Sequence, residues 1–331
     1  MDNETLKDEI LRLKKELPVT IVAHFYQKDE VFELADYSGD SLQLAKIAAN
    51  DPKPYLIFCG VAFMGQSVKI LDPKKRVFMP KAACCAMARM IDVEYFDKNV
   101  AILEDNGITK DDFIPITYIN SSAEVKARVG ELGGYVCTSS NAKKIISKAL
   151  KEDKKILFVP DRCLGANVAR DMGLTSAVIG EDDDIKNADI LCYNGFCSVH
   201  QLFSIEDIEF YRNKYPGILI ATHPECKPEV CAASDFVGST SQLIKYIKEL
   251  PKEQKVAVGT EFNMVNRLRE KNTYILSSTK PECPTMNETA LQDLYDTLIS
   301  IKNREFKNEI EVDKNVIKWA KIALDRMMQI S

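Results

Sequence analysis

The sequence lacks the features that would direct a protein to a membrane or to nucleic acid. No apolar stretch approaches the ~18 residues that a transmembrane helix needs, and the N-terminus has no apolar signal-peptide core. The net charge is −5 and there is no long basic run, so the charge pattern does not suggest a nucleic-acid partner. We therefore expect a cytoplasmic protein that binds neither a membrane nor nucleic acid.

The sequence also lacks any Cys-x-x-Cys pair, although it contains ten cysteines. This absence argues against a zinc ribbon and against a ferredoxin-type cluster. A disulfide framework is not expected either, because the cytosol is reducing. Cys59, Cys137 and Cys192 lie in apolar, strand-like runs, where a free cysteine is usually a buried core residue. We expect most of the thiols to serve packing.

Three other cysteines lie far apart, each in a short and unusual context. If the fold brings these thiolates together, they can hold an iron–sulfur cluster and leave one iron without a protein ligand. Such an iron is a Lewis acid that binds substrate, which favours an enzyme of dehydration chemistry over an electron carrier. The contexts are Ala83-Cys-Cys-Ala-Met-Ala88 around Cys85, Asn194-Gly-Phe-Cys-Ser-Val-His200 around Cys197, and Pro281-Glu-Cys-Pro-Thr-Met286 around Cys283.

A pattern of strand, turn, helix and strand occurs three times along the chain. Short runs of β-branched and aliphatic residues that alternate with helices are typical of parallel βαβ units buried on both faces. We therefore predict an α/β fold of three homologous αβα units with short parallel sheets. The repeats cover residues 55–80, 134–160 and 234–259, and an earlier strand precedes each of them at 19–24, 113–118 and 188–193.

The chain of 331 residues is long enough for two or three such units. We place the first repeat at residues 1–104, the second at 105–187 and the third at 188–284. An amphipathic helix that ends at Pro18 begins the first repeat. Residues 285–331 are predicted to form two helices that pack back on the first repeat.

Hydroxyl residues follow a strand end in every repeat, directly before a helix. They are Ser41 in the first repeat, Ser139 in the second and Thr240 in the third. Each hydroxyl alone is best explained by helix capping, which is what serine and threonine usually do there. Taken together, three helix N-termini beyond the carboxyl ends of parallel strands would form a pocket suited to a multiply anionic substrate.

The chain contains only three histidines, His24, His200 and His223, and all of them lie at strand ends or in loops. Three histidines in such positions favour a functional site over unrelated structural roles. His223 is two residues from Glu225, and a carboxylate beside an imidazole suits general acid–base chemistry.

These motifs together resemble the quinolinate synthase family, the iron–sulfur enzymes of NAD biosynthesis, over nearly the whole chain. The motifs that carry the resemblance include Ala23-His-Phe-Tyr-Gln27, Tyr118-Ile-Asn-Ser-Ser-Ala-Glu-Val-Lys126, Cys137-Thr-Ser-Ser-Asn-Ala142, Gly195-Phe-Cys-Ser-Val-His200, His223-Pro-Glu-Cys226 and Cys283-Pro-Thr-Met286.

The resemblance implies three α/β units around a pseudo-threefold axis, with the active site at the centre. It implies a [4Fe–4S] cluster held by Cys85, Cys197 and Cys283. Residue 84 is also a cysteine, but the Ala-Met-Ala that follows favours Cys85. The implied reaction is a transferase-type condensation of iminoaspartate with dihydroxyacetone phosphate, which releases phosphate and water and closes the quinolinate ring. An L-aspartate oxidase or dehydrogenase would supply the imine.

The motif positions also imply a set of residues that contact substrate. Glu225 and Tyr118 are the expected proton carriers, with Tyr26 as a further candidate. Ser139 and Thr240 are expected to bind carboxylate or phosphate oxygens. The full substrate-binding set is His24, Ser41, Tyr118, Asn120, Ser139, His223, Glu225 and Thr240.

Three other functions stay open. A different dehydratase with a three-cysteine cluster would act on another small hydroxy acid, although the motifs at 138–141 and 223–226 weigh against it. A redox sensor or electron-transfer protein would need a fourth cluster ligand, for which Cys226 and Cys84 are the candidates. A phosphate-binding protein without a cluster would bind its ligand independently of iron.

Overall fold

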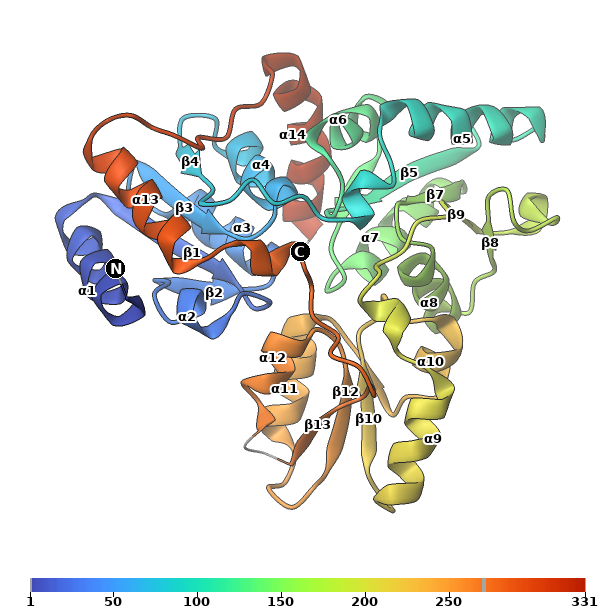
Figure 1. Ribbon diagram of the computed structural model, residues 1–331. Helices are drawn as coiled ribbons and strands as arrows, with labels where there is room; N and C mark the ends of the chain where they lie inside the picture. The colour runs from blue at the N-terminus through green and yellow to red at the C-terminus, as the bar shows by residue number, and fades with distance from the viewer. Residues whose placement is uncertain (1, 270–271, 331) are drawn as a thin grey trace. The chain divides into compact units, whose positions relative to one another are not determined.

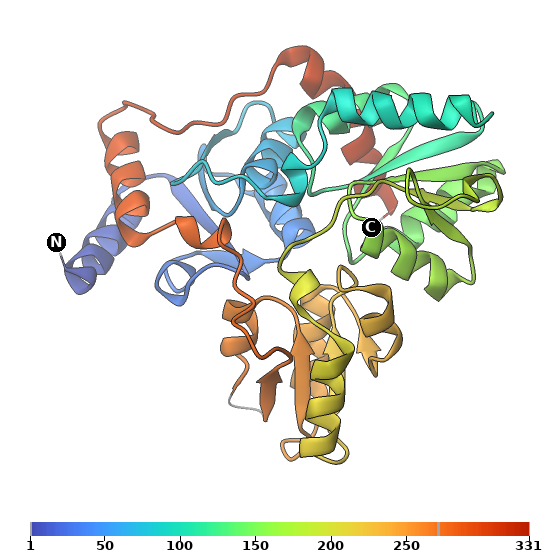
Figure 2. The same cartoon turned by 45° about the vertical axis from the view of Figure 1, so that its right-hand side comes forward.

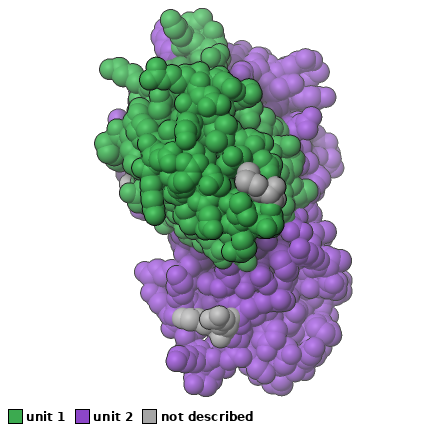
Figure 3. Space-filling model, turned by 60° about the vertical axis from the view of Figure 1, so that its left-hand side comes forward, with its two compact units in different colours: residues 1–85, 283–317 green, residues 86–282, 318–331 purple. Residues whose placement is uncertain are grey.

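The computed structural model describes residues 2–269 and 272–330 (Figure 1, Figure 2). The described strands form three sheets of four, five and four strands, and every strand pair within them is parallel. This confirms the predicted α/β class with three repeated αβα units. The chain divides into two compact units, residues 1–85 with 283–317 and residues 86–282 with 318–331 (Figure 3).

The first unit holds one sheet, with strand order β2-β1-β3-β4. The predicted N-terminal helix buries Leu6 and Ile10 in a hydrophobic core that also contains Leu294 and Leu298 of α13. The strands are β1 Val19–His24, β2 Tyr37–Gly39, β3 Tyr55–Cys59 and β4 Arg76–Phe78, and the helices are α1 Asn3–Glu16, α2 Asp29–Phe32, α3 Ser41–Asn50, α4 Ala62–Leu71 and α13 Leu291–Lys302.

The second unit holds the other two sheets, which have strand orders β6-β5-β7-β9-β8 and β11-β10-β12-β13. The five-stranded sheet consists of β5 Phe113–Tyr118, β6 Tyr135–Cys137, β7 Lys155–Val159, β8 Ser176–Val178 and β9 Ile190–Cys192, with α5 Val93–Asp105, α6 Ala123–Glu131, α7 Ala142–Ala149 and α8 Arg162–Met172. The four-stranded sheet consists of β10 Leu219–Thr222, β11 Phe236–Val237, β12 Val256–Gly259 and β13 Thr273–Ile275, with α9 Ile205–Lys214, α10 Pro228–Ala232, α11 Thr240–Glu249 and α12 Phe262–Asn266.

Strand β9 differs from the sequence expectation, which made residues 188–193 the first strand of the third repeat. It pairs with β7 instead, through Ile156↔Ile190 and Phe158↔Cys192, and so belongs to the second sheet. The first strand of the third sheet is β10, for which the sequence analysis had assigned no strand. The passage from the second sheet to the third therefore lies after residue 192.

The last helix, α14 Lys314–Ile330, also differs from expectation, because residues 318–331 belong to the second unit and not to the first repeat. The Arg326 guanidinium donates to the Gly134 carbonyl at 3.0 Å and lies 5.5 Å from the centre of the Tyr135 ring. Gly130 of α6 lets α14 approach closely, since a Cβ at this position would lie 2.1 Å from the Trp319 carbonyl oxygen. Among the described helices, none combines the length and apolarity needed to cross a membrane.

The Gly130→Ala variant tests this approach of α14 to α6. An alanine Cβ would collide with backbone, so we expect the free energy of unfolding to fall by about 1–3 kcal/mol, as for other overpacked sites. In a helix without that contact, alanine would instead stabilise by about 0.5–1 kcal/mol relative to glycine. A urea unfolding experiment gives the sign of the change in the free energy of unfolding. A stabilised variant would contradict the packing of α14 on α6.

Candidate active site

The register of the parallel strands aligns the three sheets residue by residue. In each sheet the first strand along the chain pairs with a parallel neighbour, and the last residue pair of that register is equivalent in all three sheets. Helix α4, α8 or α12 begins three residues after the second member of this pair. His24, Tyr118 and His223 directly follow the first member of that pair, so they occupy equivalent positions at the carboxyl ends of β1, β5 and β10. The matched pairs are Ala23↔Cys59, Thr117↔Val159 and Thr222↔Gly259.

Two residues further along the chain, Tyr26, Asn120 and Glu225 are likewise equivalent. The Tyr26 amide donates to His24 Nδ1 at 3.2 Å, and the Glu225 amide donates to His223 Nδ1 at 3.3 Å. These hydrogen bonds orient both imidazole rings at the carboxyl ends of β1 and β10.

The predicted hydroxyls occupy a third equivalent position. Strand pairing places Ser41, Ser139 and Thr240 next to the ends of β2, β6 and β11. Asp40 caps α3 and Ser239 caps α11, each through a capping box. Because the preceding residue is the cap, capping does not account for Ser41 or Thr240. Both residues lie at helix N-termini, where backbone amides and the helix dipole favour anions.

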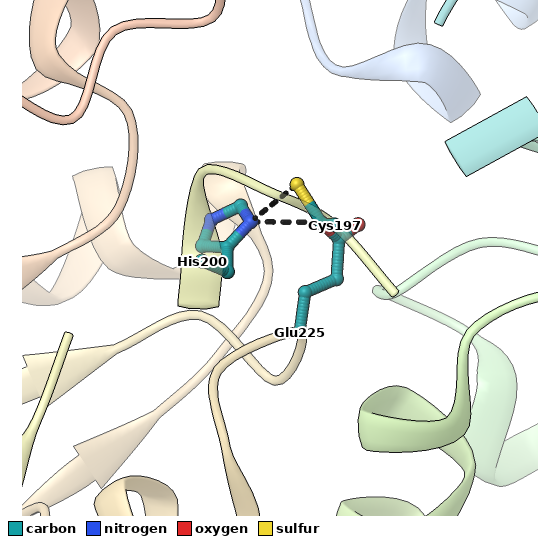
Figure 4. A group of neighbouring side chains, drawn as sticks. All are labelled: Cys197, His200 and Glu225. Carbon is teal, nitrogen blue, oxygen red and sulfur yellow. Dashed lines mark hydrogen bonds and ion pairs between the residues drawn. The ribbon is translucent and has the colours of Figure 1, made fainter. Parts of the chain in front are cut away.

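Glu225 is the centre of a buried hydrogen-bond network in the second unit. The Tyr118 hydroxyl donates to Glu225 Oε1 at 2.6 Å. His200 Nδ1 lies 2.8 Å from Glu225 Oε2 (Figure 4). These residues come from the end of β5, from a 3₁₀ helix at His200–Leu202 and from the loop after β10. Tyr118, His200 and Glu225 are each at most 5% exposed. The fold thus brings the two predicted proton carriers, Tyr118 and Glu225, into direct contact.

His200 links this network to a predicted cluster cysteine. Its Nδ1 lies 3.1 Å from Cys197 Sγ, its Nε2 lies 3.0 Å from Thr260 Oγ1, and its ring stacks on His223 with 4.7 Å between centroids. The sequence analysis noted His200 as one of three histidines but left it out of the substrate-binding set. The Cys-x-x-His spacing could have indicated this contact, since residues three apart in a tight turn lie on the same side.

The surroundings of Glu225 make it a carboxylate. Burial raises the pKa of the Glu225 carboxyl, but the charges of His200 and His223, together with the hydrogen bonds from His200 and Tyr118, outweigh burial and hold that pKa below its ordinary range. At Asp161, burial and then the charge of Glu225 raise the pKa of the carboxyl well above its ordinary value.

Asp161 is the N-cap of α8, and its two oxygens have different surroundings. Oδ1 accepts from the amides of Cys163 and Leu164 at 2.8 and 3.0 Å, whereas the buried Oδ2 has no hydrogen-bond partner among the described residues. Asp161 is a second buried carboxyl group whose pKa is influenced by the charge of Glu225, and the sequence analysis did not select it.

In the first unit, the Cys85 segment lies at the carboxyl end of the sheet. The Ala62 amide, at the start of α4, donates to the carbonyl of Ala83 at 2.8 Å. The segment that leads to Cys85 is thereby held beside the end of β3.

The Cys283 segment lies at the same end of this sheet. Gln27 Nε2 donates to the Met286 carbonyl at 2.8 Å, which ties the segment to the loop after β1. His24 ends β1 and Tyr26 lies in that loop, and their rings meet edge to face at 4.7 Å between centroids. The first unit therefore gathers two predicted cluster cysteines and two predicted substrate residues at one end of its sheet.

Comparison with known proteins identifies the family. The family model described as quinolinate synthetase A protein matches residues 8–329. The chain belongs to this family. Two proteins from Helicobacter pylori strains 26695 and HPAG1, each named quinolinate synthase, are 57% and 56% identical and cover 100% of this chain and 99% of their own length. A quinolinate synthase from Streptomyces coelicolor is 39% identical, over 94% of this chain and 84% of its own length.

Membership of the quinolinate synthetase A family confirms that the chain is an enzyme and places it in NAD biosynthesis, with transferase-type activity. Among the described residues, one group has the geometry to hold a metal ion, and it lies within the network described above. Cys197 Sγ, His200 Nδ1 and a Glu225 carboxylate oxygen all lie within 4.8 Å of one another.

The state of the cysteines fits the cluster that the resemblance implies. Burial raises the pKa of Cys59 to about 12 and that of Cys163 to about 11, and a thiolate rather than a thiol is the metal-binding form. Six cysteines are buried, although at one of them, Cys231, a hydrogen bond with Cys226 lowers the pKa, and four are half-buried. The half-buried cysteines are Cys84 and the three predicted ligands, Cys85, Cys197 and Cys283.

The Tyr118→Phe variant tests the contact between Tyr118 and Glu225. Loss of the hydroxyl removes a hydrogen-bond donor to Glu225 Oε1, so we expect the rate of quinolinate formation to fall about 100-fold or more, as for loss of a positioned acid or base. Tyr211→Phe is the matched control, because the Tyr211 hydroxyl donates to the Ile275 carbonyl at 2.8 Å, away from the network. A wild-type rate in Tyr118→Phe would show that the reaction does not need this contact.

Proposed function

We propose that the chain is a quinolinate synthase that condenses iminoaspartate with dihydroxyacetone phosphate, releases phosphate and water, and closes the pyridine ring. The observation that carries the proposal is the buried Tyr118–Glu225–His200 network beside Cys197, in a chain that belongs to the quinolinate synthetase A family. The proposal has the three repeats arranged around a pseudo-threefold axis with the active site at the centre. It also has the enzyme act in the cytoplasm.

Cys85, Cys197 and Cys283 are the proposed ligands of a [4Fe–4S] cluster. They come from three motifs far apart in the chain, and all are half-buried. Three ligands for four irons leave one iron open, and when bound the cluster supplies a Lewis acid for a substrate hydroxyl or carboxylate.

The proposed anion-binding residues suit the charge of both substrates. Iminoaspartate carries two carboxylates and dihydroxyacetone phosphate carries a phosphate. Ser41 and Thr240 stand at the beginnings of α3 and α11, and Ser139 lies three residues before α7 begins, where N–H groups and the helix dipole attract anions. His24 and His223, whose rings are oriented by the amides of Tyr26 and Glu225, are proposed to bind the same anions. Asn120 would support the binding.

The proposed proton transfers centre on Glu225. Ring closure needs a base to remove protons from carbon and nitrogen and an acid to protonate leaving hydroxyl groups. Glu225 is the proposed proton acceptor, because its carboxylate accepts a hydrogen bond from the Tyr118 hydroxyl, and that hydroxyl is the proposed proton donor. Tyr26 occupies the position equivalent to Glu225 in the first repeat and is a further candidate for proton transfer.

The chemistry of iminoaspartate also requires that an oxidation reaction precede this one. An imine of this kind hydrolyses in water, so an enzyme that oxidises L-aspartate, an oxidase or a dehydrogenase, must supply it. The proposal requires only that the two enzymes share the same compartment.

The experiment that tests the proposal is iron, sulfide and quinolinate analysis of anaerobically prepared protein. We expect about four iron and four sulfide per chain in the wild type, with cluster and activity lost together in Cys85→Ala, Cys197→Ala and Cys283→Ala. Cys84→Ala is the matched control, because this thiol is the neighbour of a proposed ligand and should leave the cluster intact.

Each departure from this result points to another function. A complete cluster without quinolinate would replace the proposal with a dehydratase that acts on another hydroxy acid. No cluster after reconstitution would leave an anion-binding protein. A cluster that survives loss of any one of the three cysteines would contradict the ligand set.

The Glu225→Gln variant tests the base. The amide cannot accept a proton, so we expect kcat to fall by about 10²–10⁴ while iron and sulfide stay unchanged. Glu229→Gln is the control, since this exposed carboxylate lies four residues along the chain. Full turnover in Glu225→Gln with an intact cluster would show that the acid–base role is wrong.

A further inference from the structure

Two buried polar side chains of the second unit belong to neither the predicted set nor the network. Lys126 lies on α6 and is 0% exposed, and Asn167 lies on α8 and is 3% exposed. A buried ammonium or amide costs free energy unless it is hydrogen-bonded, and an apolar residue would fill either space without that cost. The contacts that these side chains make therefore indicate their role.

Asn167 holds the loop of Glu225. Its Nδ2 donates to the carbonyl of Pro224 at 2.9 Å and to the carbonyl of Cys226 at 2.8 Å. These are the carbonyls on the two sides of Glu225, so one amide group bridges the backbone around the proposed base. The loop has no strand or helix of its own at these residues, and its buried carbonyls need a donor.

Lys126 makes the same kind of bridge around Asn120. Its Nζ donates to the carbonyl of Ile119 at 2.8 Å and to the carbonyl of Ser121 at 2.5 Å. These carbonyls flank Asn120, which the strand register makes equivalent to Glu225. Two different residues on two different helices thus bridge the same loop position in the second and third repeats.

We propose that Lys126 and Asn167 are positioning residues, which hold the backbone so that Asn120 and Glu225 face the substrate. The proposal rests on the proposed function for the roles of Asn120 and Glu225. Glu225 has to meet Tyr118 at 2.6 Å and His200 at 2.8 Å at the same time. A displacement of about 1 Å in such a site can cost about 100-fold in rate, so loss of the bridge acts on catalysis through Glu225.

The test compares Asn167→Ala and Lys126→Met with Lys75→Met. Lys75 is a matched control, because it is also buried, 5% exposed, and its Nζ donates to the carbonyls of Asp51 and Lys53, in a loop that carries no site residue. All three variants lose a buried donor, but the proposal expects only two of them to disturb the site.

The first measurement is amide hydrogen exchange, which does not depend on activity. We expect exchange to rise about tenfold or more in residues 223–226 of Asn167→Ala and in residues 119–122 of Lys126→Met, each without a rise in the other loop. Exchange that rises throughout the unit, or in neither loop, would overturn the proposal. This result stands even if the wild type makes no quinolinate, which would overturn only the proposed function.

The second measurement is a double-mutant cycle with Glu225→Gln. If Asn167 acts through Glu225, Asn167→Ala lowers kcat about 100-fold in the wild type but has little further effect once Glu225 is glutamine. Equal factors in both backgrounds would show a merely structural role. Lys126→Met is expected to raise KM more than it lowers kcat. If it does not fold, Lys126→Gln, which keeps a shorter N–H donor, must show the same effect on KM, and an unchanged KM contradicts the role of Lys126.

Discussion

The buried carboxylate of Glu225 is the constraint on which the described site depends. An anion removed from water needs donors for both oxygens, and here they come from Tyr118 at the end of β5 and from His200 in a 3₁₀ helix. These contacts join the two sheets of the second unit at their carboxyl ends. Breaking them would leave a buried charge without hydrogen-bond donors. Cys197 is next to the same imidazole, so the thiol and the base are placed by one contact network.

The repeat explains why these residues lie where they do. Each sheet ends its first strand at one equivalent position and places a second functional side chain two residues later. The first position holds two imidazoles and a phenol, and the second holds a phenol, an amide and a carboxylate. The threefold scaffold therefore presents different side chains at equivalent positions, and a helix with a capping box follows in the first and third repeats.

The sequence predicted the parts of this structure that local patterns encode. β1 and β5 form at the predicted residues, because a strand buried on both faces is a continuous apolar run. Residues 188–193 read as a strand too, but no local pattern says that β9 pairs with β7. The packing of α14 depends on glycine at 130, far away in the chain. Among the functional residues, motifs indicated Tyr118 and Glu225, whereas Lys126 and Asn167 look like ordinary helix residues until their contacts are known.

We propose that a cluster held by three cysteines, among them Cys197 beside Glu225, has an open iron that binds substrate. The most direct measurement is electron paramagnetic resonance of the reduced cluster, recorded with and without quinolinate, the product dianion. An iron without a protein ligand binds the added carboxylate or nitrogen, so the account predicts a shift in g values on addition. An identical spectrum at saturating quinolinate would contradict it, because a cluster whose four irons all have protein ligands has no position to offer.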